Sequence, residues 1–379
     1  MAPGGCYPWE PTKREATMRR VMAETADGRS VTYYLGTGAI ETGGTPAPRL
    51  SPHPSDGRER RYDRASGEWV LYATDRQERP VRDDGQAAGC PLCPGPASAD
   101  EWHEVARDDF RIAVFPNRFS PLGPRRTTLA GGEGRRASGG SAELVLYTPR
   151  HDRSLADLGE AHGADLVRVW ADRTRLLLAE PGVRHVLVFE NRGAEVGATL
   201  SHPHGQIYAL PFVPPRLAAL GRRERRAKVQ GGAECAFCLR LRDEMRVGTR
   251  IVDREGDLLA YVPFAARMPY ELTLAPLRCV ARLDALSDLE MAALGRLVAR
   301  TVGRYDRLFG APMPYMMAVV QAGAPRSPAP RHLRLVFQPV RRSAESLKRL
   351  ATTETLAGLY LVDLLPETMA ERLRQAGEA

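Results

Sequence analysis

Apolar residues follow two different periods along this chain of 379 residues. Leucine and valine recur at helical spacing over residues 154–180 and again over 284–309, which predicts two long helices. Shorter apolar runs, at 186–189 and 206–212, predict strands. Polar stretches rich in glycine or arginine, at 123–141 and 222–234, predict breaks between these elements.

The same order of elements occurs twice. Each half starts with a C-x-x-C pair and continues into a strand that opens with Glu-Leu, at Glu143 in one half and Glu271 in the other. A proline and then a Cys or His follow, and after them a long helix, a strand, a loop and a last strand. A repeat of this length predicts a duplicated α+β unit whose halves share one extended antiparallel sheet.

The chain therefore divides into three parts. Residues 58–221 and 222–379 form the two predicted halves, and residues 1–57 form an N-terminal extension rich in Gly, Pro and Ser. An alternating patch at 30–34 predicts an ancillary hairpin in an extension that is otherwise partly disordered.

Charge and composition argue against several classes of protein. The net charge of +8 comes almost entirely from arginine. The arginines are scattered and no stacking aromatics interleave them, so we expect anionic small molecules rather than nucleic acid as partners. No apolar run approaches the roughly 20 residues that span a bilayer, and the N-terminus holds no apolar segment of a signal peptide. We expect a cytoplasmic protein without a membrane partner.

Four of the six cysteines form two C-x-x-C pairs, Cys90/Cys93 and Cys235/Cys238. In a chain without a secretory signal, such pairs favour a metal over a structural disulfide. A thioredoxin-like redox pair is the alternative, but neither pair is predicted to open a helix after a strand.

Superposing the two halves of the sequence completes two candidate ligand sets. The first has two thiolates and two imidazoles, which suits a closed, structural Zn²⁺ site. It consists of Cys90, Cys93, His151 and His202. The second, tentative set consists of Cys235, Cys238, Cys279 and His332. Here the alternative is a buried thiol at 279 and a surface histidine at 332.

The segment 202–206, His-Pro-His-Gly-Gln, carries the candidate chemistry. Side chains two apart share one face of a strand, so His202, His204 and Gln206 are predicted to point the same way. One imidazole can serve as a metal ligand. The other, His204, can act as a nucleophile for phosphoryl or nucleotidyl transfer, with Gln206 donating to the phosphate. A polar loop that happens to contain two histidines is the alternative.

Further phosphate donors occur near this motif and earlier in the chain. Thr199 and the backbone amides of 193–197 precede it. Arg76 and Arg79 lie three apart and suit a diphosphate clamp, although the same pair fits a plain surface turn. The second half has Arg334 where the first has His204, so only the first half keeps a candidate nucleophile.

A set of motifs extends from about Arg61 to the C-terminus. They are Arg61-Tyr62-Asp63 with Gly67-Glu68-Trp69-Val70, the pair Arg76 and Arg79, Cys90-Pro91-Leu92-Cys93, Phe115-Pro116-Asn117-Arg118-Phe119, Phe189-Glu190-Asn191-Arg192-Gly193 with Gly197, His202-Pro203-His204-Gly205-Gln206, and Leu347-Lys348. Together they resemble the galactose-1-phosphate uridylyltransferases, a branch of the histidine-triad superfamily.

The resemblance implies two histidine-triad-like halves, with antiparallel sheets and flanking helices in one pseudo-symmetric unit. It implies a ping-pong transfer of UMP from UDP-glucose to a sugar 1-phosphate, usually galactose 1-phosphate, through a uridylyl intermediate on His204, with Gln206 bound to the phosphoryl group. It also implies a structural zinc at the first ligand set and a homodimer. The substrate-binding residues it assigns are Arg76, Arg79, Asn117, Asn191, Gly197, Thr199, Lys348 and Glu354.

The chain departs from the family pattern at the sugar end. The family's Lys-Phe-Leu-Ala-Gly-Ser-Glu becomes segment 348–354, with Arg349 for Phe and Thr352 for Gly. Its Trp-His-Gln-Ala-Pro becomes segment 319–323 and loses the histidine. These changes predict an intact uridylyl step and an altered choice of sugar. The alternatives are a related nucleotide-sugar phosphorylase with another base or acceptor, and a non-catalytic, zinc-stabilised nucleotide-binding protein.

Overall fold

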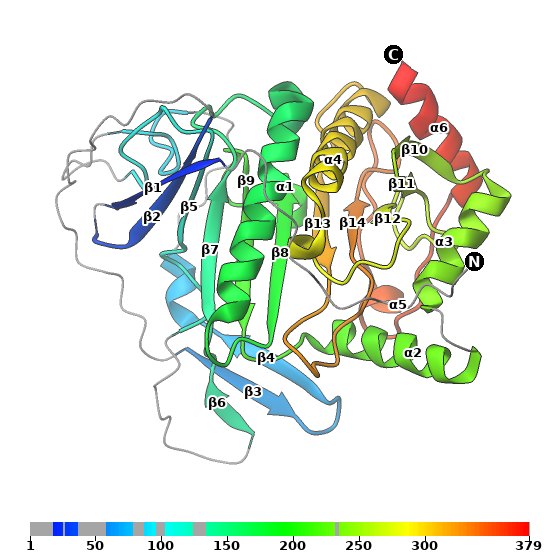
Figure 1. The fold of residues 1–379 in the computed structure, drawn as a ribbon, viewed down its shortest axis with the longest axis horizontal. Coiled ribbons are helices and arrows are strands. Elements are labelled where there is room, and N and C mark those ends of the chain that lie inside the picture. Colours follow the sequence, from blue (N-terminus) through cyan, green and yellow to red (C-terminus); the bar gives the residue numbers. More distant parts are fainter. Residues whose placement is uncertain are drawn as a thin grey trace.

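One antiparallel sheet of eleven strands runs through both halves of the chain (Figure 1). The structure is a computed structural model that describes residues 18–25, 27–36, 58–78, 87–95, 103–123, 134–231 and 235–378. In spatial order the strands of the sheet are β1 (Arg19–Glu24), β2 (Ser30–Leu35), β5 (Ile112–Pro116), β7 (Ser141–Leu146), β9 (His204–Leu210), β8 (His185–Arg192), β13 (Tyr315–Val320), β14 (Arg334–Pro339), β12 (Leu272–Pro276), β11 (Leu258–Tyr261) and β10 (Ile251–Glu255).

The strand order confirms the predicted duplication. The order β5-β7-β9-β8 in the first half is repeated in reverse as β13-β14-β12-β11 in the second, and the halves meet where β8 pairs with β13. The register at this junction places Met317 opposite Glu190 and Ala318 opposite Phe189. The two halves therefore share one continuous ladder of backbone hydrogen bonds.

The predicted N-terminal hairpin is present, with β1 paired to β2, but it is an integral part of this sheet rather than an ancillary element. β2 pairs with β5 in a register that places Thr32 opposite Val114. Val31, Tyr33 and Leu35 on β2 are buried in an apolar cluster with residues of β5. β2 lies beside β5 in the first half as β10 lies beside β11 in the second. Because successive side chains of a strand point to opposite faces of the sheet, the apolar positions of β2 alternate.

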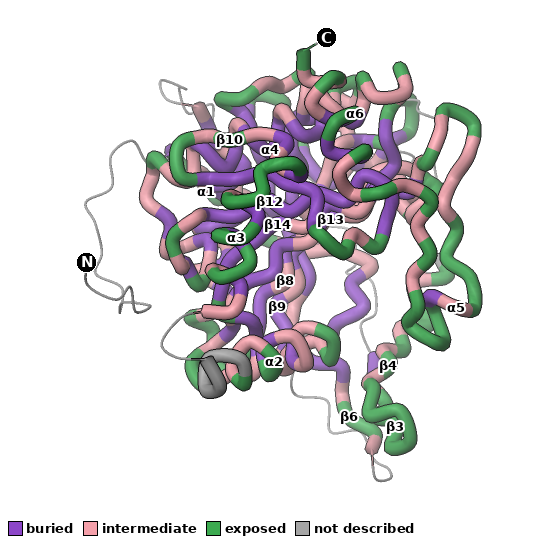
Figure 2. Tube along the Cα trace, turned by 90° about the vertical axis from the view of Figure 1, so that its right-hand side faces the viewer, coloured by how far each residue is buried: buried purple, intermediate pink, exposed green. Residues whose placement is uncertain are grey.

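Two predicted breaks contain regular structure. Helix α2 (Pro215–Gly231) runs through the polar stretch at 222–234, so the domain boundary placed at 221/222 falls inside a helix. Its Arg, Ala, Glu and Lys residues are good helix formers, and their polarity had suggested a loop. The stretch at 123–141 contains β6 (Arg135–Ala137), which joins β3 (Glu59–Asp63) and β4 (Glu68–Tyr72) in a second, small sheet. The burial colours of Figure 2 show this sheet as largely exposed.

Both long helices occur where the apolar spacing predicts them. They are α1 (Leu155–Ala179) and α4 (Asp288–Leu308), and each starts with a capping box, at Ser154 and Ser287. They lie next to each other on one face of the sheet (Figure 1), and the core between helices and sheet is buried in Figure 2. The remaining helices are α3 (Ala236–Val247), α5 (Thr352–Thr355), α6 (Pro366–Glu378) and the short turns η1 (Thr74–Glu78), η2 (Ala194–Val196) and η3 (Leu283–Ala285).

The two long helices touch backbone to backbone at a pair of glycines. A Cβ on Gly163 of α1 would lie 2.3 Å from the carbonyl oxygen of Gly295 on α4. A Cβ on Gly295 would lie 2.3 Å from the carbonyl carbon of Gly163. Only glycine permits this approach, because any side chain would push the helices apart. Among the described helices, none combines the length and the apolar composition needed to cross a membrane.

Replacing Gly295 by Ala should destabilise the fold. The methyl group meets backbone atoms that cannot rotate away, so we expect a loss of roughly 1–3 kcal/mol or more in the free energy of unfolding. Gly303→Ala is the matched control in the same helix, because its Cβ would meet only the mobile guanidinium of Arg307 and, at 3.7 Å, the methyl of Ala156. Equal stability of the two variants in denaturant titrations would contradict this packing argument.

His185 should make the fold sensitive to acid. Its ring is fully buried at the start of β8, and neither ring nitrogen has a hydrogen-bond partner among the described residues. Burial lowers the pKa of His185 to about 4, whereas an unfolded histidine titrates near 6.5. The unfolded chain therefore takes up the proton first, so this contribution is intact above pH 6.5 and is lost progressively down to pH 4.

The loss attributable to His185 should reach about 3 kcal/mol at pH 4. The measurement compares the pH dependence of the unfolding free energy of the wild type with that of His185→Phe, in which all other titrating groups are shared. We expect the wild type to lose more stability than the variant between pH 6.5 and pH 4. Parallel curves would show that His185 contributes nothing to acid sensitivity.

Candidate active site and metal-ligand clusters

Three neighbouring strands form the floor of the candidate active site. β9 lies between β7 and β8, and the register aligns Leu144, Gln206 and Phe189 in one row across the strands. Because side chains alternate, the face that carries Gln206 also carries His204 and Tyr208 on β9. Asn191 on β8 lies on this face as well, and all of these residues line one cavity.

The imidazole of His204 is oriented by the backbone of the same motif. Its Nδ1 lies 2.7 Å from the carbonyl oxygen of His202. A carbonyl can only accept a hydrogen bond, so a neutral His204 carries its proton on Nδ1 and keeps a lone pair on Nε2. Burial lowers the pKa of His204, which favours this neutral form. A neutral ring held in this way can act as a base or as a nucleophile through Nε2.

The cavity above these strands has a volume of about 610 Å³. It brings together seven residues that the sequence had singled out, although they come from five separate segments. They are Arg76, Asn117, Asn191, Gly197, Thr199, His204 and Gln206. Arg79, the second arginine of the predicted clamp, lies outside the described residues. Gly197 has φ 82°, a left-handed conformation that the turn after η2 requires.

The cavity wall also contains residues that the sequence reasoning missed. Tyr208 lies two positions beyond Gln206, and its hydroxyl is 3.5 Å from the amide oxygen of Gln206. Extending the alternation of the motif by one step would have found it. His103 and Glu104 line the cavity from an irregular loop, where no periodic pattern points to them.

Lys348 and Glu354 are not among the residues that line this cavity. They form an ion pair with each other, and Glu354 is almost fully buried. The carboxylate of Glu354 also accepts hydrogen bonds from the Ala351 amide at 3.0 Å and the Thr353 hydroxyl at 2.8 Å. Within one chain this carboxylate stabilises the start of α5 and does not face the cavity.

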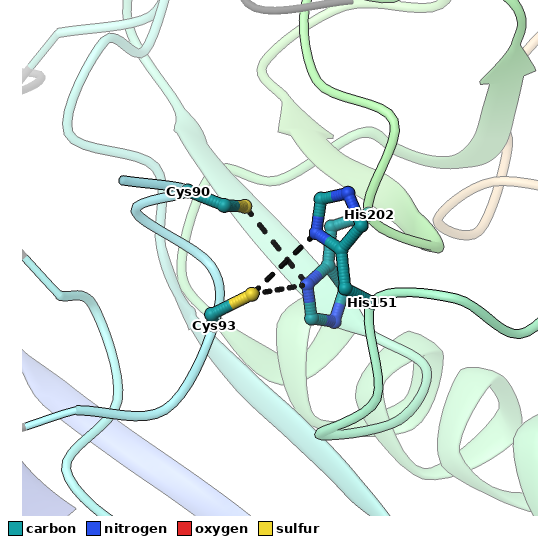
Figure 3. Close-up of side chains that lie close together, drawn as sticks. All are labelled: Cys90, Cys93, His151 and His202. Carbon is teal, nitrogen blue, oxygen red and sulfur yellow. Dashed lines mark hydrogen bonds between the residues drawn. The ribbon is translucent and has the colours of Figure 1, made fainter. Parts of the chain in front are cut away.

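The first candidate ligand set converges at the edge of the active site. Four donor atoms, from Cys90, Cys93, His151 and His202, lie within 4.8 Å of one another. Their side chains point toward a common centre in Figure 3. The Cys93 sulfur lies 3.5 Å from Nδ1 of both histidines, close to the roughly 3.5 Å between ligands of a tetrahedral zinc.

Hydrogen bonds behind the first cluster hold its histidines in position. Nε2 of His202 donates to the Thr148 carbonyl at 2.9 Å, which leaves the lone pair on Nδ1, the atom that faces the sulfurs. Nε2 of His151 lies 3.1 Å from the Ser201 hydroxyl. Such outer hydrogen bonds are typical of metal-binding histidines. The donor set and its orientation therefore fit a metal ion.

The second ligand set converges in the same way. Cys235, Cys238, Cys279 and His332 also place four donor atoms within 4.8 Å of one another. Nε2 of His332 donates to the Pro276 carbonyl at 2.9 Å, so Nδ1 again faces the sulfurs. This geometry favours the metal site over the alternative of a buried thiol and a surface histidine, and His332 is in fact fully buried.

The second cysteine pair opens a helix, but not one that follows a strand, in agreement with the expectation. Cys235 is the N-cap of α3 and Cys238 lies in its first turn, but the preceding element is α2 rather than a strand. Because His332 and Cys279 complete the cluster, the arrangement matches a metal site and not a thioredoxin-like pair.

The two halves differ at the position of His204. Arg334 replaces it on β14 and donates to the His332 carbonyl at 3.0 Å, the same bond that His204 makes with His202. The guanidinium also pairs with Glu224 at 3.0 Å and lies 4.2 Å above the ring of Phe237. In the second half, therefore, a cation occupies the position equivalent to His204, with a carboxylate and an aromatic ring beside it.

Comparisons with known proteins point to one family. The family model described as galactose-1-phosphate uridyl transferase, N-terminal domain, matches residues 51–214. A galactose-1-phosphate uridylyltransferase of Thermotoga maritima is 33% identical over 324 residues, which cover 84% of this chain and 98% of the relative. Another from Streptomyces lividans is 36% identical over 303 residues, covering 76% of this chain and 79% of the relative.

Solved structures agree with this relationship. A structure described as a uridylyltransferase has a TM-score of 0.74 at 30% identity, over 84% of this chain and 98% of that one. An ADP-glucose phosphorylase from Arabidopsis thaliana with bound ADP-glucose has a TM-score of 0.62 at 21% identity, which shows a shared fold alone. From its sequence, its strand order and its relatives, the chain belongs to the galactose-1-phosphate uridylyltransferase family and is an enzyme of the transferase class.

Proposed function

We propose that this enzyme transfers UMP from UDP-glucose to a hexose 1-phosphate through a uridylyl group on His204. The observation that carries the proposal is the tautomer of His204. Its Nδ1 is engaged with the His202 carbonyl, so the lone pair belongs to Nε2 in a cavity lined by phosphate donors. The proposed substrates are taken from the family, because the relatives are named galactose-1-phosphate uridylyltransferases.

The transfer takes two displacements at phosphorus. Nε2 of His204 attacks the α-phosphorus of UDP-glucose, and the bond to the β-phosphate breaks to release glucose 1-phosphate. A phosphate oxygen of the acceptor then attacks the same phosphorus, and the N–P bond breaks to return neutral His204. Each step forms one bond to phosphorus and breaks one, so no other co-reactant is needed.

The residues around His204 supply charge stabilisation and binding. The side-chain amide of Gln206 and the hydroxyl of Thr199 can donate to the nonbridging oxygens, which carry growing charge in the transition state. Arg76 adds a positive charge at the cavity wall, and we propose that Arg79 does the same. Asn117 and Asn191 would hold the nucleotide, with the turn at Gly197 beside the phosphates.

We propose a structural Zn²⁺ at each Cys/His cluster. Two thiolates with two imidazoles, and three thiolates with one imidazole, are ordinary tetrahedral zinc sets. With four protein ligands each site has no open position for substrate. The first ion would hold the loop of Cys90 and Cys93 against His202, and so would position the strand that starts at His204.

We propose that one chain does not complete the sugar end of the site by itself. Lys348 and Glu354 are paired with each other away from the cavity, yet the family resemblance assigns this segment to the sugar. We propose a homodimer in which a second copy completes the sugar end of the site. The uridylyl step then depends on the residues of the cavity, whereas the choice of acceptor depends on segment 348–354 with its Arg349 and Thr352.

The first test detects the intermediate directly. The protein is incubated with UDP-glucose or ADP-glucose labelled in the nucleotide, and adducts are located by mass spectrometry. We expect one UMP per chain on His204 with UDP-glucose, no adduct with His204→Gly, and a loss of about 10²–10³ in rate with Gln206→Ala. Retained metal content and an unchanged unfolding temperature of each variant show that the fold is intact.

Several outcomes of this experiment would change the conclusion. Normal turnover of His204→Gly would exclude the covalent mechanism. Loading by ADP-glucose alone, with inorganic phosphate as acceptor, would indicate a phosphorylase instead. Binding of nucleotide without any adduct would indicate a non-catalytic protein.

Metal content provides an independent prediction. Elemental analysis of protein purified without chelators should give two zinc ions per chain. Cys90→Ser should remove one ion and lower stability, and Cys279→Ser should remove the other while the first is retained. Cys6→Ser is the matched control, because Cys6 belongs to neither ligand set. A single zinc that is unaffected by Cys279→Ser would exclude the second site.

A further inference from the structure

The N-terminal hairpin β1–β2 lies outside the 51–214 segment that matches the family model. It nevertheless adjoins the candidate active site, because β2 pairs with β5. The last residue of β5 is Pro116, and the next residue, Asn117, lines the cavity. The turn of the hairpin reaches the same end of β5 through Arg29.

Arg29 binds one residue of the cavity wall and the backbone next to another. Its Nη1 donates to the carbonyl of Pro116, and its Nη2 donates to Oε2 of Glu104 at 2.5 Å. Glu104 itself lines the cavity and is 5% exposed. The arginine therefore joins the loop that carries Glu104 to the end of the strand that leads into Asn117.

The hairpin turn holds the arginine in a fixed geometry. Nε of Arg29 donates to both oxygens of Asp27, at 2.8 and 2.6 Å, and Asp27 also accepts from the Thr25 hydroxyl at 2.6 Å. The backbone of Arg29 is bound to Thr25 as well, in both directions. An arginine fork anchored on one side can bind on the other with little further loss of entropy.

Asn117 makes two hydrogen bonds of its own beside Pro116. Asn117 donates its backbone N–H to the Ala142 carbonyl at 2.8 Å, and its side-chain oxygen accepts from the Phe119 amide at 2.9 Å. The side-chain NH₂ of Asn117 is therefore the part of the amide available to a ligand. A shift of Pro116 would move that NH₂ directly, because the two residues are adjacent.

We propose that the hairpin is a working part of the nucleotide site and that Arg29 is a positioning residue for Asn117 and Glu104. This inference rests on the proposed function, since it takes the cavity as the site of the donor nucleotide. Arg29 is not among the residues that line the cavity. Its loss should therefore weaken binding of the nucleotide and leave the chemical step nearly unchanged.

The experiment compares three variants of the full-length, zinc-loaded protein. Binding of UMP is measured by calorimetry. Turnover is measured as the exchange of labelled glucose 1-phosphate into UDP-glucose through His204, which gives KM for UDP-glucose and kcat. With Arg29→Met we expect about a tenfold rise in the dissociation constant of UMP and in KM, with kcat within about twofold, since charge-assisted hydrogen bonds are lost. Arg29→Lys keeps the charge without the planar guanidinium. Its dissociation constant for UMP and its KM should therefore lie between those of the wild type and of Arg29→Met.

Arg20→Met is the matched control. Arg20 lies on the same hairpin, its side chain is 43% exposed, and it pairs with Asp172 at 3.0 Å rather than with the cavity wall. We expect UMP binding and KM to equal those of the wild type. Equal weakening by Arg20→Met and Arg29→Met would overturn the proposal, because the hairpin would then contribute only general stability.

The outcomes also separate this inference from the proposed function. Unchanged UMP binding in Arg29→Met would overturn the inference while leaving uridylyl transfer intact. If the wild type binds UMP but forms no adduct with UDP-glucose, the transfer mechanism is wrong and the UMP comparison still decides the role of Arg29. If the wild type binds no UMP, the cavity is not a nucleotide site and both proposals fall.

Discussion

The pairing of β8 with β13 is the contact on which the rest of the molecule depends. It joins the strands of the two halves into one sheet of eleven strands, and α1 and α4 lie side by side on the same face of that sheet. Gly163 and Gly295 allow that, because a side chain at either position would clash with the other helix. Beneath the junction, Glu190 accepts hydrogen bonds from Tyr147 of one half and Tyr315 of the other, at 3.1 and 2.9 Å. Burial raises the pKa of this carboxyl to about 7.

On its other side, β8 pairs with β9, the strand that begins at His204. The alternating side chains of β8 separate two tasks: Phe189 and Asn191 face the active-site cavity, whereas Glu190 faces the junction between the halves. β9 is enclosed between β8 and β7, so the position of His204 is fixed from both sides. The first Cys/His cluster adjoins the remaining end, at His202. A nucleophile needs this rigidity, because an in-line attack tolerates little misplacement.

The duplicated halves differ at the position of His204 and share the arrangement of their Cys/His clusters. Each half holds a histidine whose Nε2 donates to a backbone carbonyl at the end of the adjacent strand, at Thr148 just after β7 or at Pro276 on β12. The histidine's own carbonyl orients the side chain two residues later. In one half that side chain is His204 and in the other it is Arg334. A guanidinium cannot give up its proton, so it cannot act as the nucleophile. The second half therefore contributes support rather than a second site.

The sequence alone determined the elements whose signal is local. The spacing of leucines located α1 and α4, the repeated order of motifs predicted the shared sheet, and the Cys and His types predicted both ligand sets with every member in place. Such features depend on the period of the chain and on ligand chemistry, which a sequence shows directly. The polar stretch at 222–234 was predicted to be a break, but α2 runs through it. Its polar residues are also good helix formers, which the prediction did not weigh.

Tertiary structure decided what depends on contacts between distant segments. Only the fold shows that the hairpin β1–β2 joins the main sheet and that Arg29 reaches Glu104 and Pro116, because nothing local encodes a contact across 75 or 87 residues. Only the fold places His103 and Glu104 at the cavity and withdraws Glu354 into an ion pair with Lys348. The proton on Nδ1 of His204 likewise follows from a carbonyl at 2.7 Å, a distance set by the path of the backbone. The sequence shows which residue types are available for a site, but packing decides which of them come into contact.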